Sequence, residues 1–177
     1  MNYREALSFV HSRQKFGSRP GLDSIRRITE LCNNPQRDMR FIHIAGTNGK
    51  GSVSTMLSNI LIESNKKIGL YISPYVIDFR ERIQMNGEMI SKKDFARIIT
   101  LLAPLVERID GEGLTVTEFE LITCAAFIYF KEKGCDFAVL EVGMGGRLDA
   151  TNIIESPEVS VITRIDLDHT AVLGDTV

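Results

Sequence analysis

The sequence predicts an α/β fold in which a mostly parallel sheet is covered by helices. Four short, almost continuously apolar runs alternate with segments whose apolar residues recur at helical intervals. Strands that are buried on both faces have this continuous apolar character, and helices among the connections supply the cover. A polar or glycine-rich turn follows each apolar run, and parallel sheets bind ligands at the edge where such turns gather.

The elements follow one another in an order that suits this fold. Helical spacing covers residues 2–16, 22–32, 52–63 and 117–131, and a further helix is predicted from Ser91, an N-cap with Asp94 three residues on. Strands are predicted at 41–45, 67–72, 137–140 and 159–163. The long polar stretch from Pro74 to Glu88 carries no predicted element.

Composition restricts the class of protein. The 177 residues suffice for one α/β domain, with 44% hydrophobic and 25% charged residues and a net charge of −2. No cluster of basic residues predicts a nucleic-acid partner, and no export signal or membrane-spanning run is present, so a cytoplasmic protein is expected. Cys32, Cys124 and Cys135 lack metal-binding spacing and are interpreted as small buried side chains.

The segment Gly46–Ser52 has the layout of a phosphate-binding loop between a strand and a helix. Glycines turn backbone N–H groups toward an anion, and the new helix adds unpaired N–H groups and a partial positive charge. Lys50 would contact the terminal phosphates and Ser52 would offer a hydroxyl to Mg²⁺. The loop is shorter than the common GxxxxGK[ST] pattern, and Gly51 separates the two residues. The alternative is a glycine-rich turn that binds nothing.

Two further residues are candidate metal ligands. Glu141 ends an apolar strand, where a carboxylate can position magnesium, although a solvated surface Glu is the alternative. His169 follows two aspartates just beyond another strand. His11 is predicted on an exposed polar helix face, and His43, inside the first strand, as a hydrogen-bonded structural residue.

These motifs together resemble one family. The string from His43 to Ser52 is similar to the ATP loop of folylpolyglutamate and dihydrofolate synthases, relatives of the Mur peptidoglycan ligases. Further matches follow in order: Ser73-Pro74 with Glu81-Arg82-Ile83 and Asn86-Gly87, Thr117–Glu120, Glu141–Asn152, and Asp168-His169-Thr170 through Leu173-Gly174. Tyr75 and Met144 depart from the family's usual His and Leu.

The resemblance implies a P-loop-containing, Mur-ligase-like ATPase domain and assigns roles to its residues. Lys50, Glu141 and His169 would be catalytic. The ATP phosphates would contact Thr47, Asn48, Gly49, Lys50, Gly51 and Ser52. Two Mg²⁺ sites would draw on Ser52, Ser73, Glu141 and His169. The pterin pocket would be lined by Thr117, Glu118, Phe119, Glu120, Leu148, Asp149 and Ala150.

The implied reaction joins L-glutamate to dihydropteroate, to reduced folylpolyglutamates, or to both, through an acyl phosphate that ATP supplies. No nucleophilic side chain is needed, and no GxSxG elbow for a serine triad occurs. A Mur-type ligase acting on a UDP-muramyl substrate is the alternative. A GTPase-like switch lacks its NKxD motif.

The resemblance also bears on domain organisation. Residues 1–177 match the N-terminal part of the ATP-binding domain, so a truncated protein, inactive by itself, is expected. A carbamylated lysine, the adenine contacts and a glutamate-binding domain would lie outside this chain. A monomer is expected.

Overall fold

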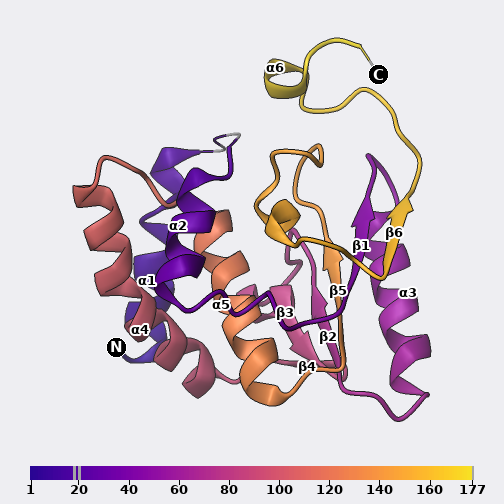
Figure 1. The fold of residues 1–177 in the computed structure, drawn as a ribbon, viewed down its shortest axis with the longest axis horizontal. Coiled ribbons are helices and arrows are strands. Elements are labelled where there is room, and N and C mark those ends of the chain that lie inside the picture. The colour runs from indigo at the N-terminus through magenta and orange to yellow at the C-terminus, as the bar shows by residue number, and fades with distance from the viewer. Residues whose placement is uncertain (18, 20, 177) are drawn as a thin grey trace.

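A six-stranded sheet forms the centre of the computed structural model, which describes residues 1–17, 19 and 21–176. The strand order is β4-β3-β2-β5-β1-β6 (Figure 1). The strands are β1 (Phe41–Ala45), β2 (Ile68–Tyr71), β3 (Ile83–Met85), β4 (Glu88–Met89), β5 (Phe137–Glu141) and β6 (Val159–Ile162). The four predicted strands are β1, β2, β5 and β6, and they pair in parallel.

The antiparallel hairpin of β3 and β4 lies in the stretch where no element was predicted. It extends the sheet from β2, with Tyr71 opposite Ile83. Asn86 and Gly87 form its turn with φ of 50° and 79°, the backbone conformation that Asn-Gly favours in tight hairpins. This turn signal was present in the sequence, but the flanking residues are too few and too polar for a strand pattern.

The helices are α1 (Tyr3–His11), α2 (Asp23–Leu31), α3 (Lys50–Ile62), α4 (Lys92–Gly111), α5 (Glu118–Lys133) and α6 (Thr170–Leu173), with 3₁₀ turns η1 (Gln14–Phe16), η2 (Phe79–Arg82) and η3 (Ala150–Ile153). The predicted helix over 2–16 was too long. It stops at His11, and the Ser12 hydroxyl donates to the carbonyl oxygen of Phe9 at 2.6 Å, which competes with further helical hydrogen bonding.

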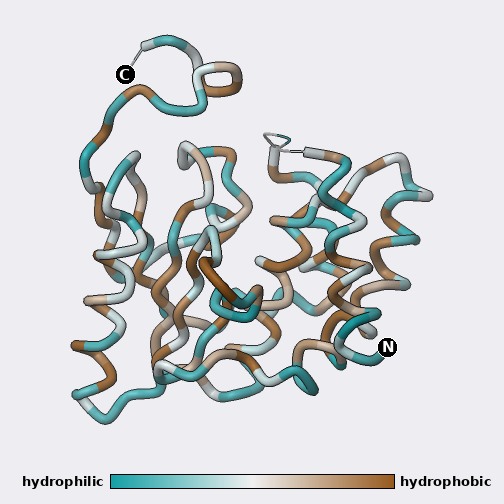
Figure 2. The backbone as a smooth tube through the Cα atoms, turned by 180° about the vertical axis from the view of Figure 1, so that it is seen from behind, coloured by the Kyte–Doolittle hydropathy of each residue, from teal (hydrophilic) through white to brown (hydrophobic). Residues whose placement is uncertain are grey.

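Helices cover both faces of the sheet. Ile42 and Ile44 of β1 pack with Val139 of β5 toward α3 on one face. On the other face, Phe41 and Leu140 belong to the larger core, built with α5 and, farther out, α1, α2 and α4 (Figure 1). Hydrophobic segments run along the strands and the helix packed on them, whereas the connecting turns are hydrophilic (Figure 2). No helix in the described ranges is long and apolar enough to cross a membrane.

Helix α5 is buried along most of its length and is well defined at both ends. Thr117 and Glu120 form a capping box at its start, and Gly134, in the left-handed conformation, ends it. Cys124 is buried on this helix, whereas Cys32 and Cys135 are half-buried, and all three thiols are free. The prediction of small buried side chains is confirmed for Cys124, whereas Cys32 and Cys135 are only partly buried.

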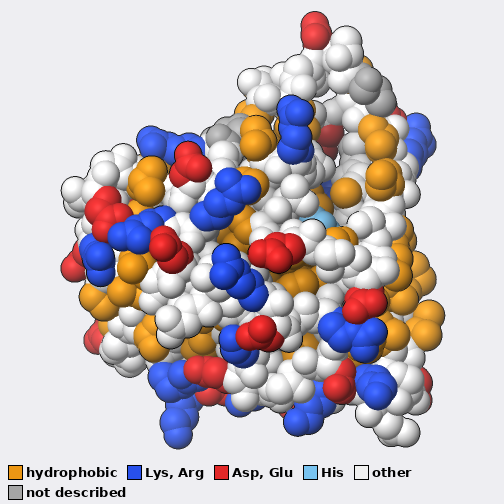
Figure 3. Space-filling model, in the orientation of Figure 1, with side chains coloured by type: hydrophobic (Ala, Val, Ile, Leu, Met, Phe, Trp, Pro, Cys, Tyr) orange, Lys and Arg blue, Asp and Glu red, His pale blue; other side chains and the backbone are white. Residues whose placement is uncertain are grey.

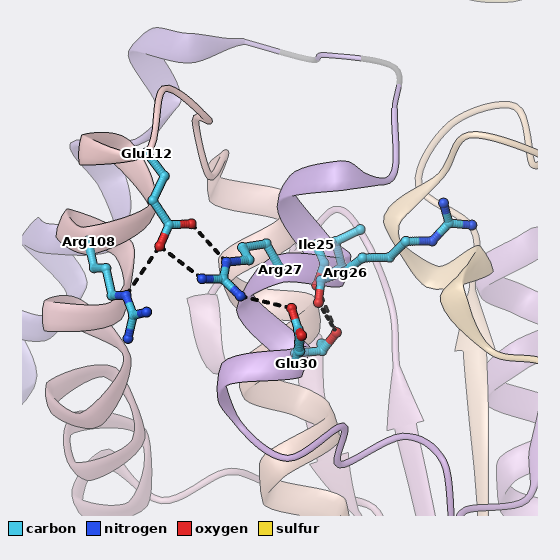
Figure 4. A network of polar contacts seen from close by, with 7 residues as sticks. Ile25, Arg26, Arg27, Glu30, Arg108 and Glu112 are labelled. Atoms are coloured by element: carbon cyan, nitrogen blue, oxygen red, sulfur yellow. Dashed lines mark hydrogen bonds and ion pairs between the residues drawn. The ribbon is translucent and has the colours of Figure 1, made fainter.

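An ion-pair network joins α2 to α4 on the outside of the molecule (Figure 4). The Arg27 guanidinium donates two hydrogen bonds, of 2.8 and 2.9 Å, to the carboxylate of Glu112. Arg108 donates to the same carboxylate, and the two guanidinium groups lower the pKa of Glu112 to about 2. Because these side chains face solvent, the network orients the helices and adds little to stability.

We predict that Gly69→Ala destabilises the fold, because a Cβ on β2 would lie 2.8 Å from the buried ring of Phe130. Overpacking of this kind costs about 1–3 kcal/mol of unfolding free energy, measurable by urea denaturation. Gly111→Ala is the matched control, since a Cβ there meets nothing within 4 Å. Equal stability of the two variants would contradict the packing of α5 on β2.

Candidate functional site

The turns after the four parallel strands meet at one edge of the sheet, toward the top of Figure 1. A cavity of about 850 Å³ opens there. Its lining includes Lys50, Ser73, His169, Thr117, Glu118, Phe119, Glu120, Leu148, Asp149 and Ala150. A second cavity of about 340 Å³ lies beside it, and Gly46, Thr47, Lys50 and His169 contribute to its wall. Most residues singled out in the sequence therefore surround one space, although they come from distant segments.

The glycine loop joins β1 to α3 through a tight turn. Gly46 and Gly49 have φ of 136° and 85°, which favours glycine at both positions. A Cβ on Gly46 would also collide with the Thr163 hydroxyl. Helix α3 begins at Lys50, two residues before the predicted start, so that Lys50, Gly51 and Ser52 form its first turn. The unpaired N–H groups of that turn make an anion-binding end.

The side chain of Lys50 folds over its own loop. Its ammonium donates to the carbonyl oxygen of Gly46 at 2.7 Å and of Thr47 at 3.2 Å. Both partners are neutral, so the positive charge stays available at the junction of the two cavities, whose walls it shares. Asn48 and Ser52 are exposed and lie outside both linings.

Glu141 is buried at the end of β5, with 4% of its surface exposed. Its carboxylate accepts the backbone N–H of Ser73 at 2.9 Å. Both carboxylate oxygens lie 3.5 Å from the position that a Cβ on Gly51 would take, so this glycine leaves the acid open to the first turn of α3. Burial raises the pKa of Glu141, and the Ser73 N–H and the Lys50 charge oppose that shift. The alternative of a solvated surface Glu is wrong.

The four predicted metal ligands gather only in part. Ser73 is bonded to Glu141, whereas His169 is exposed, with its Nε2 3.8 Å from the Asp168 carboxylate. No group of three His, Cys, Asp or Glu residues in the described ranges could hold a metal by itself. A buried carboxylate such as Glu141 still suits Mg²⁺, which proteins commonly hold with one or two carboxylates plus phosphate oxygens and water.

The predicted pterin-contacting motif forms the start of α5. Thr117 donates to the Glu120 carboxylate from both its backbone N–H and its hydroxyl, each at 2.8 Å. This carboxylate is buried and engaged with its own helix end. Phe119 packs against the glycine-rich loop after β5, where a Cβ on Gly143 would collide with its ring. Shape at this wall therefore depends on a glycine facing an aromatic ring.

The other predicted wall, Leu148 to Ala150, has one exposed and two buried residues. Leu148 is 47% exposed. The buried Asp149 carboxylate accepts the backbone N–H of Met144 at 2.9 Å and the Thr151 hydroxyl at 2.6 Å. Asp149 thus borders the cavity, and its carboxylate also holds the loop between Met144 and Asp149 in place.

Arginines of this cavity were missed as site residues. Arg19, Arg82 and Arg147 all line it. The Arg82 side chain, from the motif Glu81-Arg82-Ile83, lies 3.3 Å from Glu118 and is only 12% exposed. Its guanidinium stacks over the rings of Tyr75 and Phe79, and its buried Nε has no partner among the described atoms. The available signal was the arginine itself, which stands within the matched motif Glu81-Arg82-Ile83.

The histidine predictions divide. His43 is a hydrogen-bonded structural residue, as predicted, with its Nε2 2.8 Å from the Thr151 hydroxyl. The prediction of a solvent-exposed His11 is wrong. Its Nδ1 lies 3.3 Å from Glu118, and its ring packs edge-on against Phe79 at 5.1 Å. Tertiary packing of η2 on α1 covers part of a helix face that looked polar, and 34% of the His11 side chain stays exposed.

The charges around the larger cavity favour an anionic ligand. Glu118, Glu120 and Asp149 are each bonded to protein donors, whereas Lys50 is bonded only to carbonyl groups. On the face seen in Figure 3, basic and acidic side chains are interspersed.

Known proteins share this sequence and fold. Residues 44–176 match the model of the Mur ligase middle domain. The dihydrofolate synthase/folylpolyglutamate synthase of Bacillus subtilis is 41% identical over 99% of this chain and 41% of its own length. The folylpolyglutamate synthase of Lacticaseibacillus casei is 37% identical over 100% and 42%.

Solved structures agree. Folylpolyglutamate synthase from Thermotoga maritima matches with a TM-score of 0.87 at 43% identity, over 93% of this chain and 38% of that one. A complex of FPGS with AMPPCP and folate matches with a TM-score of 0.88 at 40% identity, over 99% and 43%. The chain thus spans about two fifths of the length of these relatives. The resemblance and the α/β fold inferred from the sequence are confirmed, and the chain belongs to the Mur ligase middle domain family.

Proposed function

We propose that this chain supplies the nucleotide- and acceptor-binding parts of an ADP-forming ligase. The ligase joins L-glutamate to dihydropteroate, to folylpolyglutamates, or to both. One observation carries the proposal: Lys50, Ser73 and the two predicted pterin walls line a single cavity at the carboxyl edge of the sheet. Relatives named for these two activities and a relative complexed with AMPPCP and folate support it.

The nucleotide would lie with its phosphates on the first turn of α3. Gly49 to Ser52 would offer backbone N–H groups, and Thr47 and Asn48, whose own N–H groups bond the Arg164 carbonyl, would border the phosphates. Lys50 would exchange its carbonyl partners for phosphate oxygens. That exchange favours binding, because a hydrogen bond between two charged groups is stronger than one to a neutral carbonyl. Ser52, Ser73, Glu141 and His169 would hold two Mg²⁺ ions, which neutralise charge on the transferring phosphoryl group.

The acceptor would enter the larger cavity with its carboxylate toward Lys50. Phe119, Leu148 and Ala150 offer apolar surface to a ring system. Glu120 and Asp149 shape the walls, since their carboxylates are already bonded to protein donors. The Arg82–Glu118 pair adds a charged group with an unpartnered donor.

The chemistry proposed here has two steps. The acceptor carboxylate attacks the γ-phosphate of ATP to form an acyl phosphate and ADP, and the glutamate amine then displaces phosphate. Two like charges at 4 Å repel by roughly 1 kcal/mol in water and about 4 kcal/mol at an effective dielectric of ~20. Lys50 offsets this repulsion, and holding both reactants in one cavity can contribute about 7–11 kcal/mol. No protein nucleophile takes part.

The proposal predicts ligand selectivity. Isothermal titration of the 177-residue chain should detect AMPPCP and pteroate, with no binding of a UDP-muramyl compound. The reverse preference would favour a Mur-type cell-wall ligase. In a polypeptide of the relatives' length that carries this sequence, glutamate ligation to dihydropteroate and to folylpolyglutamate should be assayed separately.

Replacing the lysine should remove the phosphoryl-transfer step. In that longer polypeptide, Lys50→Ala should lower ADP release by about 100-fold or more, the scale expected for loss of one group that stabilises transition-state charge. Unfolding by urea should be nearly unchanged, because Lys50 bonds only to two neutral carbonyls of its own loop. Lys66→Ala, at an exposed turn, is the control. ADP release at the rate of the control would refute the role of Lys50.

Removing the buried charge should weaken magnesium dependence. Glu141→Gln retains the size of the side chain, and the amide oxygen can still accept the Ser73 N–H. The Mg²⁺ concentration for half-maximal ADP release should rise by roughly tenfold or more. Glu107→Gln, exposed on α4, should leave the titration unchanged. Superimposable Mg²⁺ titrations of wild type and Glu141→Gln would exclude Glu141 as a ligand.

A further inference from the structure

A buried chain of hydrogen bonds runs from β1 to the cavity wall. The Nε2 of His43 lies 2.8 Å from the Thr151 hydroxyl, which lies 2.6 Å from Oδ1 of Asp149. The three residues are 9%, 0% and 6% exposed. Asp149 borders the larger cavity, whereas His43 and Thr151 border neither cavity.

The chain has one consistent direction. Oδ1 of Asp149 also accepts the backbone N–H of Thr151, and Oδ2 accepts that of Met144, both at 2.9 Å. Burial raises the pKa of Asp149, and the donors on both of its oxygens oppose that shift and favour the ionised carboxylate, which can only accept. The single hydroxyl proton of Thr151 therefore goes to Asp149, and the hydroxyl oxygen accepts from His43. Burial lowers the pKa of His43 to about 4, so its neutral ring carries one proton, on Nε2.

Asp149, the last residue in this series of hydrogen bonds, holds a loop that lines both cavities. Asp149 closes the segment 142–149 by bonding the backbone of Met144 at its other end. Gly143, Met144 and Gly146 from this segment line the larger and the smaller cavity alike. A shift of the Asp149 carboxylate would therefore move the wall that separates the two spaces.

His43, at the other end of this series of hydrogen bonds, lies close in sequence to the phosphate loop. His43 is three residues before Gly46 on β1, and its neighbours in the sheet are Leu140 of β5 and Ser160 of β6. The strand that leads into the nucleotide loop thus also anchors the acceptor wall. Reacting groups must be held to within a fraction of an ångström for effective transfer.

We infer that His43 and Thr151 are positioning residues that act through Asp149 to hold the loop 142–149 between the nucleotide and acceptor spaces. The expected effect on ligand binding rests on the function proposed above, whereas the hydrogen bonds from His43 to Asp149 do not. Two measurements therefore test the hydrogen bonds and the ligand binding separately.

The first measurement tests the hydrogen bonds from His43 to Asp149 in the ligand-free protein. The protein has three histidines, so ¹⁵N NMR of the imidazole nitrogens resolves each ring. We expect His43 to be neutral at pH 7 with the proton on Nε2 in wild type and in Thr151→Ser. In Thr151→Val the Nε2–H loses its acceptor, and its shift should change. A proton on Nδ1 in wild type would overturn the proposal, because the donor order would be reversed.

The second measurement reads the acceptor wall by titration with pteroate. His43→Gln keeps an N–H donor near the Nε2 position, whereas His43→Leu removes it at similar volume. We expect His43→Leu and Thr151→Val to weaken pteroate binding by about tenfold or more, and His43→Gln and Thr151→Ser to stay within about threefold of wild type.

Thr29→Val is the matched control for a general loss of stability. Thr29 is fully buried in α2, and its hydroxyl donates to the carbonyl of Ile25 at 2.8 Å, away from either cavity. We expect this variant to lower the melting temperature without changing pteroate affinity. If affinity instead follows melting temperature across all five variants, His43 and Thr151 are structural only and the proposal fails. If wild type binds no pteroate, the proposed function fails, and the NMR result still decides the hydrogen-bond chain.

Discussion

Parallel pairing of β1 with β5 and β6 is the constraint on which the site depends. Because the three strands run in the same direction, the loops that leave them emerge at one edge. The pairing is tight there: the Gly46 backbone lies against Thr163, and backbone N–H groups of the phosphate loop donate to the Arg164 carbonyl. The shape of the phosphate loop is therefore set by the neighbouring strand as well as by its own glycines.

Burial of acidic groups at this edge follows a common pattern. Glu120 and Asp149 are buried with raised pKa values, and each is compensated by donors from its own helix or loop. Glu141 is different, because its compensation comes only from the backbone N–H groups of Ser73 and Gly51 and from the Lys50 charge. A buried carboxylate with few donors retains capacity for a cation, which singles it out among the three acids.

Several residues of the site have structural duties as well. Thr117 and Glu120 cap α5 while they line the cavity, and Phe119 fills the space left by a glycine across from it. The motif Thr117–Glu120, which was predicted to contact a ligand, therefore also determines where α5 starts. Arg82 shows the converse, since a residue to which no role was assigned lies in the cavity wall, with Phe79 and Tyr75 packed around its guanidinium.

The sequence by itself determined the parallel strands, the phosphate loop and the family, because each has a local signature: apolar runs of strand length, glycines beside a lysine at a helix start, and ordered motifs. It also singled out Glu141 and ten of the residues that line the larger cavity. Only the tertiary structure decided the β3–β4 hairpin, the partial burial of His11, the place of Arg82 in the cavity wall and the His43–Thr151–Asp149 hydrogen bonds. These depend on contacts between segments up to about a hundred residues apart. No local pattern encodes which side chains will meet across such distances, because that is set by the packing of whole elements against one another.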